Sequence, residues 1–488
     1  MTHIRIDQKR TKIVATIGPT SRDEATLRQI IRTGVDVARI NFSHGDHETH
    51  SKSIDDVRRI AAEEGSIVAI LADIQGPKIR IGKIASEPLS LATGDTITLT
   101  LDAADGSNNT VTLPHPEFMK DIKPGLALLI DDGKLEFEVR ATTGRALVCD
   151  VIIGGDLTSR KGVSAPKARH TMTAITDKDR ADVAFALSKN VEYVAMSFVR
   201  SDNDIREMRW LIRHVGGNAS IIAKVEKHEA LENIEAIIKA SDGIMVARGD
   251  LGVETPAEEV PFHQKRIIAL CNKAGKPVIT ATQMLSSMVD NPRPTRAEAS
   301  DVYNAIIDGT DAVMLSNETA SGQFPTRAVE TMANIANIAE RHIVKPELLL
   351  DDDSPVDPDS PEMTADAVCQ STVQIADALG CAAIVTLTLG GYTARRVARE
   401  RPKTPIICAT PNEITRQRMA LVWGVIPLYV GEFTTIDEML RVVVRACAEA
   451  RLVKVGDRIV IIAGVPFGVT GQTNFLKIHT VGESGELE

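Results

Sequence analysis

The sequence predicts an α/β protein: a (β/α)₈ TIM barrel with an inserted all-β lid domain and a C-terminal α/β domain. Eight short β-branched apolar runs alternate with amphipathic helical segments. One long stretch after the third run alternates apolar and polar residues instead, and a stretch rich in proline and acids precedes a last set of strands and helices. Strand–helix alternation is typical of parallel βαβ units, and eight units indicate a closed barrel.

The eight apolar runs are the expected barrel strands. They are Lys12–Ile17, Val35–Ile40, Ile67–Ala72, Val191–Met196, Ser220–Ala223, Gly243–Ala247, Val278–Ala281 and Asp311–Leu315. Two helix starts fit the capping-box spacing, in which two side chains satisfy each other's free backbone amide: Ser21 with Glu24, and Thr295 with Glu298. The barrel is therefore expected to occupy residues 1–80 and 169–344, its last helix being Thr326–Arg341.

Residues 81–168 break the strand–helix pattern. Runs such as LSLATGDTITLTL and KLEFEVR alternate at period two between Gly, Asp and Asn turns. Such alternation predicts an antiparallel β domain inserted between the third and fourth strands, which could close over the barrel mouth as a lid.

A second change of composition follows the barrel. Residues 345–362 carry prolines and clustered acids without periodicity and are expected to be an exposed linker. Residues 363–488 are expected to form a separate α/β domain. Its predicted helices are Thr364–Leu379, Thr393–Arg401, Asn412–Val422 and Ile436–Leu452, and its predicted strands are Ala382–Thr388, Pro405–Ala409, Ile426–Val430, Arg458–Ala463 and Phe475–Val481.

Composition narrows the function classes. A formal net charge of −10 argues against a general nucleic-acid binder. The six cysteines show no metal-type spacing and are expected to be buried thiols in a reducing compartment. The start of the chain has no signal-peptide pattern, and no apolar run has the length of a membrane span, so we expect a cytoplasmic protein without membrane contact.

Polar residues of catalytic type follow nearly every predicted barrel strand. Since active sites of such barrels form at the carboxyl ends of the strands, these residues are expected to build one site. They are Gly18, Arg39, Asn41, Ser43, Asp73, Ser197, Lys224, Glu226, Arg248, Asp250, Thr282, Ser316 and Glu318.

Several ordered motifs together resemble pyruvate kinases, over essentially the whole chain. The motifs are ARINFSHG (Ala38–Gly45), DIQGPKIR (Asp73–Arg80), AKVEKHEA (Ala223–Ala230), MVARGDLG (Met245–Gly252), ATQML (Ala281–Leu285), NPRPTRAEASD (Asn291–Asp301) and MLSNETASG (Met314–Gly322). The resemblance implies transfer of a phosphoryl group from phosphoenolpyruvate to ADP, giving pyruvate and ATP, and a homotetramer.

The carboxylates of Glu226 and Asp250 can converge above the barrel, and hard oxygen donors suit Mg²⁺ or Mn²⁺. The resemblance assigns them as ligands of the divalent ion. Lys224, two residues before Glu226, can neutralise phosphoryl oxygens in flight. By resemblance, Arg39 contacts the same group.

The resemblance also implies the remaining contacts. Arg80 and Lys161 serve the nucleotide phosphates, and Lys161 lies on the inserted domain, so lid closure would deliver it. Thr282 and Ser316 are the expected proton path to the enolate, through water, since neither hydroxyl is acidic enough alone. The backbone amides of Gly249 and Asp250 suit the substrate carboxylate. Further expected nucleotide contacts are Asn41, His44 and Pro19, with a structural role open for the last two; Glu318 could act chemically or cap local backbone.

Two positions depart from the family pattern. Many pyruvate kinases hold K⁺ on residues matching Asn41, Ser43 and Asp73, beside a glutamate whose position is Lys78 here. An ammonium carries the same charge as K⁺, so we expect activity that does not require K⁺. Asn317 stands where the family usually has glycine, and asparagine tolerates a left-handed backbone better than most residues.

The segment TLTLGGYTARRVAR places hydroxyls and a Gly-Gly pair before a predicted helix, a turn that can hold a phosphate. By resemblance this is the pocket of a phosphorylated effector, completed by the loop Ala463–Asn474; AMP, a sugar monophosphate and fructose 1,6-bisphosphate remain open, as does a ligand-free helix cap. Its residues are Thr386, Thr388, Gly390, Gly391 and Thr393. Two other functions stay open: another phosphoenolpyruvate-handling barrel enzyme, and an inactive metabolite sensor.

Overall fold

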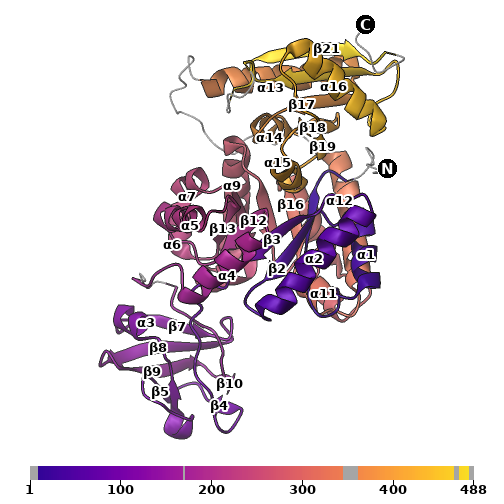
Figure 1. The fold of residues 1–488 in the computed structure, drawn as a ribbon. Helices are drawn as coiled ribbons and strands as arrows, with labels where there is room; N and C mark the ends of the chain where they lie inside the picture. The colour runs from indigo at the N-terminus through magenta and orange to yellow at the C-terminus, as the bar shows by residue number, and fades with distance from the viewer. Residues whose placement is uncertain (1–8, 167, 169–170, 344–360, 467–471, 483–488) are drawn as a thin grey trace.

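A closed eight-stranded parallel barrel forms the centre of the molecule in a computed structural model, which describes residues 9–166, 168, 171–343, 361–466 and 472–482 (Figure 1). The expected linker thus lies almost wholly outside the described residues. The strand order around the barrel is β1-β2-β3-β12-β13-β14-β15-β16, with β16 returning to β1. The strands are β1 (Lys12–Thr16), β2 (Val37–Asn41), β3 (Ala69–Asp73), β12 (Tyr193–Met196), β13 (Ser220–Val225), β14 (Gly243–Ala247), β15 (Val278–Ala281) and β16 (Ala312–Leu315).

Helices surround this barrel, and their apolar faces pack on the outer faces of the strands in one large buried cluster. They are α1 (Glu24–Thr33), α2 (His47–Glu63), α4 (Asp177–Ser188), α5 (Asp202–His214), α6 (His228–Glu232), α7 (Ile234–Ala240), α8 (Arg248–Glu254), α9 (Val260–Ala274), α10 (Arg296–Ile307), α11 (Asn317–Ala320) and α12 (Pro325–Ala339). The barrel fold predicted from the sequence is confirmed.

Of the two capping boxes predicted from the sequence, one is confirmed and one is wrong. The capping box of Thr295 and Glu298 at the start of α10 is confirmed. The one predicted for Ser21 and Glu24 is wrong, because α1 begins after Asp23, whose side chain accepts from the amide of Thr26. The Ser21 hydroxyl instead accepts from the amide of Gly18 at 3.0 Å, within the turn that follows β1.

Between β3 and α4 the chain forms a β-rich module with its own apolar core. It consists of β4 (Leu89–Leu91), β5 (Thr96–Thr100), β6 (Thr110–Thr112), α3 (Pro116–Asp121), β7 (Ala127–Ile130), β8 (Leu135–Thr142), β9 (Ala146–Ile153), β10 (Gly155–Leu157) and β11 (Val163–Ser164). The prediction of purely antiparallel pairing is wrong in one place, since β5 and β6 pair in parallel. We call this module the lid.

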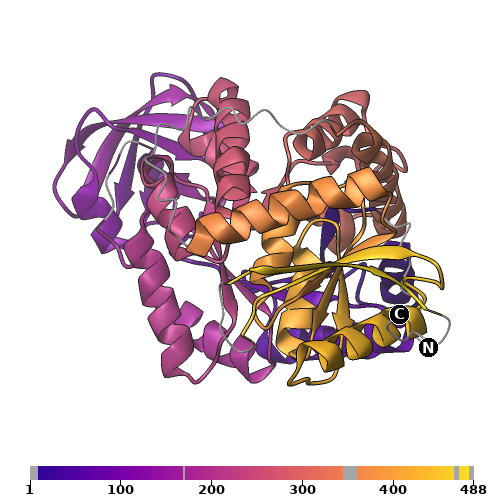
Figure 2. The ribbon, with the colours of Figure 1, turned by 90° about the horizontal axis from the view of Figure 1, so that it is seen from above.

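A five-stranded sheet with helices on both faces covers the end of the barrel opposite the lid (Figures 1 and 2). Its strand order is β19-β18-β17-β20-β21, and β21 is antiparallel to β20. The elements are α13 (Pro361–Leu379), β17 (Ala383–Leu387), α14 (Tyr392–Arg399), β18 (Ile406–Thr410), α15 (Glu413–Arg418), β19 (Val425–Tyr429), α16 (Ile436–Glu449), β20 (Arg458–Ala463) and β21 (Phe475–Thr480).

This C-terminal unit closes the amino-terminal end of the barrel. Ala420 and Leu421, in the short 3₁₀ turn after α15, pack into the barrel interior with residues such as Val14 and Met245. All six cysteines are buried and free, as expected. Within the described parts of the chain, no helix is both long and apolar enough to cross a membrane.

Candidate active site

The centre of the candidate site is a buried group of charges at the carboxyl ends of β2, β3 and β13. Lys224 and Glu226 project to the same side because they lie two residues apart along an extended chain. The Nζ of Lys224 is 2.7 Å from Oε1 of Glu226 and 3.2 Å from Oδ1 of Asp73. It also donates a hydrogen bond of 2.8 Å to the hydroxyl of Ser197. Lys224 is therefore held between two carboxylates.

Asp73 also holds Arg39, through the second oxygen of its carboxylate. Its Nε donates to Oδ2 of Asp73 at 2.7 Å, and its Nη1 donates to the hydroxyl of Thr16 at 2.9 Å. Asp73 therefore bridges the two cations and orients both. Two cations fixed at the barrel mouth can stabilise oxygen atoms that become more negative during a reaction.

The electrostatics of this group follow from burial and pairing. Burial alone would raise the pKa of Asp73, but Lys224 and Arg39 outweigh it and the pKa lies below its ordinary value. Burial would lower the pKa of Lys224, but Asp73 and Glu226 hold it above the ordinary value, so the ammonium stays charged. Burial raises the pKa of Glu226; Lys224 opposes this, and the charge of Asp250 adds to it.

Glu226 and Asp250 could hold a divalent metal ion. Glu226 follows β13 and Asp250 lies in the first turn of α8, which begins directly after β14. Burial raises the pKa of Glu226 most and the charge of Asp250 raises it further, and a divalent cation would relieve the repulsion between the two carboxylates. Among the described residues, no group of three or more His, Cys, Asp or Glu side chains forms a metal cage. Two carboxylates with open positions fit Mg²⁺ or Mn²⁺, which keep substrate oxygens and water as ligands.

Thr282 meets the start of α8 in a strained conformation. It has φ of 65°, in the left-handed region that β-branched residues rarely adopt. Its hydroxyl accepts from the amide of Gly249 at 2.8 Å and donates to the carbonyl of Ala281 at 2.7 Å. One of the two amides expected to bind the substrate carboxylate is thus occupied by Thr282 in this structure. Such strain is typical of functional sites.

Ser316 and its neighbours follow β16. The amide of Ser316 donates to Oε2 of Glu318 at 2.7 Å, and Oε1 of the same carboxylate accepts from the amide of Leu285 at 3.1 Å. Glu318 thus caps local backbone, one of its two expected roles. Asn317 opens α11 and is absent from the residues with positive φ among those described, so this position does not need the left-handed backbone that asparagine tolerates.

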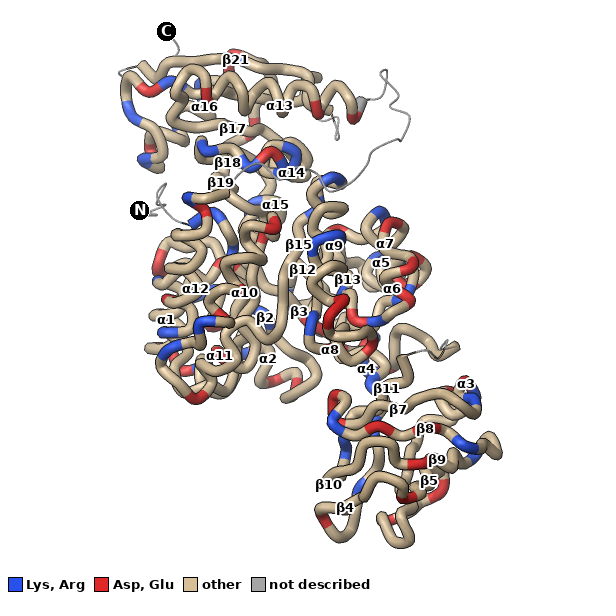
Figure 3. Tube along the Cα trace, turned by 180° about the vertical axis from the view of Figure 1, so that it is seen from behind, with Lys and Arg blue, Asp and Glu red and all other residues tan. Residues whose placement is uncertain are grey.

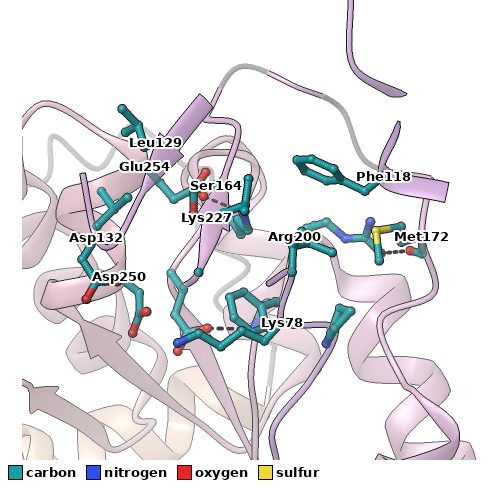
Figure 4. A pocket seen from close by; sticks show the side chains of 17 residues that line it. Lys78, Phe118, Leu129, Asp132, Ser164, Met172, Arg200, Lys227, Asp250 and Glu254 are labelled. Carbon is teal, nitrogen blue, oxygen red and sulfur yellow. Dashed lines mark hydrogen bonds and ion pairs between the residues drawn. The ribbon is translucent and has the colours of Figure 1, made fainter. Parts of the chain in front are cut away.

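Lys78 lines a small pocket between the barrel mouth and the lid, together with Glu226 and Asp250 (Figure 4). In the part of the chain that the structure describes, no ion pair joins Lys78 to Asp73. Asp73 is engaged by Arg39 and Lys224 instead, and the side chain of Asn41 accepts from the amide of Ser43 at 3.1 Å. Lys78 therefore lines the same pocket as Glu226 and Asp250, the two carboxylates that could bind a metal ion.

The expected nucleotide contacts fall into two groups. Arg80 and Lys161 meet where the chain enters and leaves the lid: the amide of Ile81 donates to the carbonyl of Lys161 at 3.0 Å. Lys161 is paired with Asp131 of the lid at 2.8 Å, and Arg80 donates to the carbonyl of Arg160. The second group belongs to the barrel and comprises Pro19, Asn41 and His44, of which the first and last are exposed.

The expected effector turn lies between β17 and α14. The hydroxyl of Thr388 accepts from the amide of Gly391, and the hydroxyls of Thr393 and Thr473 are 2.9 Å apart. Thr386 is wholly buried and donates to a carbonyl of β18, while no heavy atom lies within 4 Å of a Cβ built on Gly390. Residues 467–471 of the loop expected to complete this pocket lie outside the described residues.

Sequence reasoning missed three residues of the pocket. Phe198 has φ of 56° and donates its amide to Oε2 of Glu226 at 2.9 Å, which fixes that carboxylate. Lys227 and Glu254 form an ion pair of 2.5 Å on the pocket wall, visible in Figure 4. Only the position of Phe198, two residues after the end of β12, could have indicated it.

Comparison with known proteins agrees with this geometry. The family model for the pyruvate kinase barrel domain matches residues 8–329, and the model for the pyruvate kinase alpha/beta domain matches residues 366–479. A pyruvate kinase of Geobacillus stearothermophilus is 46% identical over 98% of this chain and 81% of its own length. One from Clostridium perfringens is 45% identical over 97% of this chain and 100% of its own length. Pyruvate kinase 2 of Synechocystis is 46% identical over 97% of this chain and 79% of its own length.

Proposed function

The chain belongs to the pyruvate kinase family, and from this premise we propose how its own residues divide the reaction among them. The reaction is a phosphoryl transfer in glycolysis: phosphoenolpyruvate gives its phosphoryl group to ADP, and pyruvate and ATP result. The observation that supports the assignment is the buried group in which Lys224 lies 2.7 Å from Glu226 and 3.2 Å from Asp73. Such a site supplies charge and position, which are most of phosphoryl-transfer catalysis.

Glu226 and Asp250 are the protein ligands of the divalent ion in this proposal. When bound, the ion neutralises phosphate and enolate oxygens and holds both substrates. Glu226 is fixed for this role by the amide of Phe198, and Asp250 by the first turn of α8. Lys224 and Arg39 contact the phosphoryl group in transfer, where each stabilises charge on its oxygens.

The enolate must receive a proton to become pyruvate. Thr282 and Ser316, after β15 and β16, are the proposed path, through water. The amides of Gly249 and Asp250 bind the substrate carboxylate once Thr282 releases the amide of Gly249. Arg80 and Lys161 bind the nucleotide phosphates, and Pro19, Asn41 and His44 contact the nucleotide from the barrel. Lys161 reaches them when the lid moves and its pair with Asp131 opens.

The proposal includes activity without K⁺. Lys78 brings one positive charge into the pocket that also contains Glu226 and Asp250. In this proposal its ammonium replaces the monovalent ion that the family holds at the positions of Asn41, Ser43 and Asp73. We expect equal rates in K⁺ and in tetramethylammonium, and a K⁺ requirement in the Lys78→Glu variant. A rate that collapses in tetramethylammonium in the unmodified enzyme would refute this part.

The C-terminal unit is proposed to bind a phosphorylated effector on the turn of Thr386, Thr388, Gly390, Gly391 and Thr393. The enzyme is proposed to act as a homotetramer. Titration with AMP, ribose 5-phosphate and fructose 1,6-bisphosphate distinguishes the three effector classes. Sedimentation of the full chain measures the oligomer.

A coupled assay tests the whole assignment. The full chain with phosphoenolpyruvate, ADP and Mg²⁺ should form pyruvate and ATP in equal amounts. The assay is repeated with Mn²⁺, with and without K⁺, and with each effector candidate. If no pyruvate forms under any condition, the assignment fails; pyruvate without ATP would indicate a different phosphoenolpyruvate-handling enzyme.

A further inference from the structure

A cavity of about 790 Å³ lies at the end of the barrel opposite the candidate active site. Its barrel wall includes Tyr193, Ser220, Asp242 and Pro277, which stand at the amino-terminal ends of β12 to β15. Its other wall is formed by α14 and the end of α15 in the C-terminal unit. The cavity therefore lies between the two units, and neither encloses it alone.

Cations dominate the charge of this cavity. Of the nine charged side chains that line it, six are cations and three are acids. Asp242 is already engaged, because Arg209 binds it at 3.0 Å and the amide of Ile221 donates to it at 2.8 Å. Arg396 is paired with Asp366. Figure 3 shows Lys and Arg along α14 where the C-terminal unit meets the barrel. The cations are Lys239, Lys273, Lys276, Arg395, Arg396 and Arg418.

Arg395 is a partly buried cation without a carboxylate. Its Nη1 donates to the carbonyl of Gly390 at 3.1 Å, and within the described residues no acid lies at ion-pair distance from its guanidinium. Burial lowers the pKa of Arg395, although Tyr193 and Asp242 act in the opposite direction. A guanidinium has five donors, and placing it away from water without a counter-charge is costly. An anion in the cavity would remove that cost.

Two further donors on the same wall lack partners. The Nε of Arg418 and the hydroxyl of Tyr392 are buried and make no hydrogen bond with any described residue. The guanidinium of Arg418 is nevertheless fixed, since its Nη2 donates to the backbone and side chain of Asn218 in the barrel. Buried polar atoms in native proteins nearly always have partners. Neither of these two atoms has appreciable exposed surface, so they lie behind the cavity wall, and the donors that can reach a ligand are the other nitrogens of Arg418 and those of Arg395.

The rest of the lining is apolar. Ile238 and Leu270 of the barrel face the cavity with Met419 and Val422 of the C-terminal unit. A volume of about 790 Å³ lies within the range of small-molecule sites. A ligand with an anionic group and a less polar body would fill both parts.

We propose that this cavity binds a phosphate-bearing metabolite, with its phosphate on Arg395 and Arg418. Arginine pairs with phosphate through two parallel hydrogen bonds, which suits two guanidinium groups with free donors. This site goes beyond the effector turn proposed above. It shares Gly390 with that turn but uses different side chains and a wall of the barrel.

A ligand bound by Arg418 would lie next to the residues with which the C-terminal unit closes the barrel. Ala420 and Leu421, which close the barrel end, follow two and three residues later and pack with Met245 and Val14. A ligand held by Arg418 and by the barrel wall links the two units directly at this closure. Binding is therefore expected to resist their separation.

Calorimetry on the full chain tests the proposal, with inorganic phosphate, ribose 5-phosphate and AMP as separate probes. At least one probe should bind, and Arg395→Met and Arg418→Met should each weaken it by about tenfold or more, as expected for losing a charged phosphate contact. Arg416→Met is the matched control, since Arg416 lies on the same helix, pairs with Glu413 and does not line the cavity. Thr388→Val separates this site from the effector turn.

Arg416→Met and Thr388→Val are expected to retain that binding. Thermal unfolding checks that each variant is folded. Hydrogen exchange of the unmodified chain gives a second readout, with protection expected over residues 239–242, 273–277 and 415–422 when the probe is bound. The proposal is overturned if no probe binds, if Thr388→Val alone abolishes binding, or if folded arginine variants bind as well as the unmodified chain.

Discussion

The two ends of the barrel treat their buried cations differently. At the mouth, Arg39 and Lys224 share the carboxylate of Asp73, and Lys224 also meets Glu226. At the opposite end, Arg395 and Arg418 line a large cavity without an acidic partner among the described residues. At the mouth, Asp250 adds a second carboxylate beside Glu226, which suits a metal ion, whereas the far cavity has a surplus of cations, which suits an anion. The cations at the two ends of the barrel therefore differ in their partners and their burial rather than in residue type.

The same contrast appears in the pKa directions. Burial would lower the pKa of both Lys224 and Arg395. Asp73 and Glu226 reverse the effect for Lys224, whose pKa lies above its ordinary value. Nothing reverses it for Arg395, whose pKa stays lowered. Four variants break or sharpen this comparison.

The largest effect is expected for Lys224→Met at the mouth. Loss of the ammonium removes charge stabilisation from the phosphoryl group, and kcat should fall by about 10³-fold, as for other groups that neutralise a phosphoryl group in transfer. The coupled assay measures this. Lys178→Met is the control, because Lys178 pairs with Asp182 with half of its side chain exposed, and it should keep its activity. A Lys224→Met enzyme with normal kcat would contradict the role proposed for the mouth.

Arg401→Met tests a paired arginine at the far end. Arg401 binds Asp311 at 3.0 Å and Asn272 at 3.0 Å, and it lies over the ring of Trp423 with 4.8 Å to the centroid. Its loss leaves a buried carboxylate unpaired, so stability should fall by about 3–5 kcal/mol. Urea unfolding followed by the fluorescence of buried Trp423 reports it.

The double variant Arg401→Met/Asp311→Asn is the matched control for this pair. It removes the orphaned charge and should recover part of the lost stability. If Arg401→Met unfolds at the same urea concentration as the unmodified chain, the pair does not hold the two units together. Arg395→Met, at the unpaired position, should cost less stability than Arg401→Met.

The sequence predicted the mouth better than the far end. Apolar runs bounded by turns located the strands to within about two residues, and because parallel strands end at one face, Glu226 and Asp250 were expected together. Pairing was not predictable: which cations Asp73 binds depends on how three strands meet. The left-handed backbone of Thr282 likewise accompanies a contact with Gly249, distant in the sequence, and has no signature in sequence.

The far cavity was beyond sequence reasoning for a physical reason. Its walls come from segments far apart in the sequence, such as Ser220 and Arg418, which meet only when the C-terminal unit docks. The capping error at α1 is a small instance of the same limit. Ser21 and Asp23 both have side chains that can cap a helix. The turn after β1 engages the hydroxyl of Ser21, so Asp23 caps α1.

Glu226→Gln tests the pair of carboxylates at the mouth. The amide keeps an acceptor for Phe198 but loses the negative charge, so the Mn²⁺ concentration for half-maximal activity should rise by about 10- to 100-fold. Glu254→Gln is the control, because Glu254 lines the same pocket in a pair with Lys227. An unchanged metal dependence of Glu226→Gln would remove Glu226 from the proposed ligands.

The smallest effect is expected for a buried histidine in the first turn of α2, which belongs to neither group of cations. His50 of α2 is buried against the ring of Phe42, with 4.4 Å between centroids, and burial lowers its pKa, with Arg22 adding to the effect. The unfolded chain therefore binds a proton more readily than the folded one. The contribution of His50 is present above its unfolded pKa of about 6.5 and is lost as pH falls through the lowered folded value. Against His50→Leu, the unmodified chain should lose on the order of 1 kcal/mol between pH 7.5 and 5, measured by urea unfolding. A pH-independent difference between the two would show that His50 titrates alike in both states, and that the first turn of α2 tolerates a buried charge as the paired mouth does.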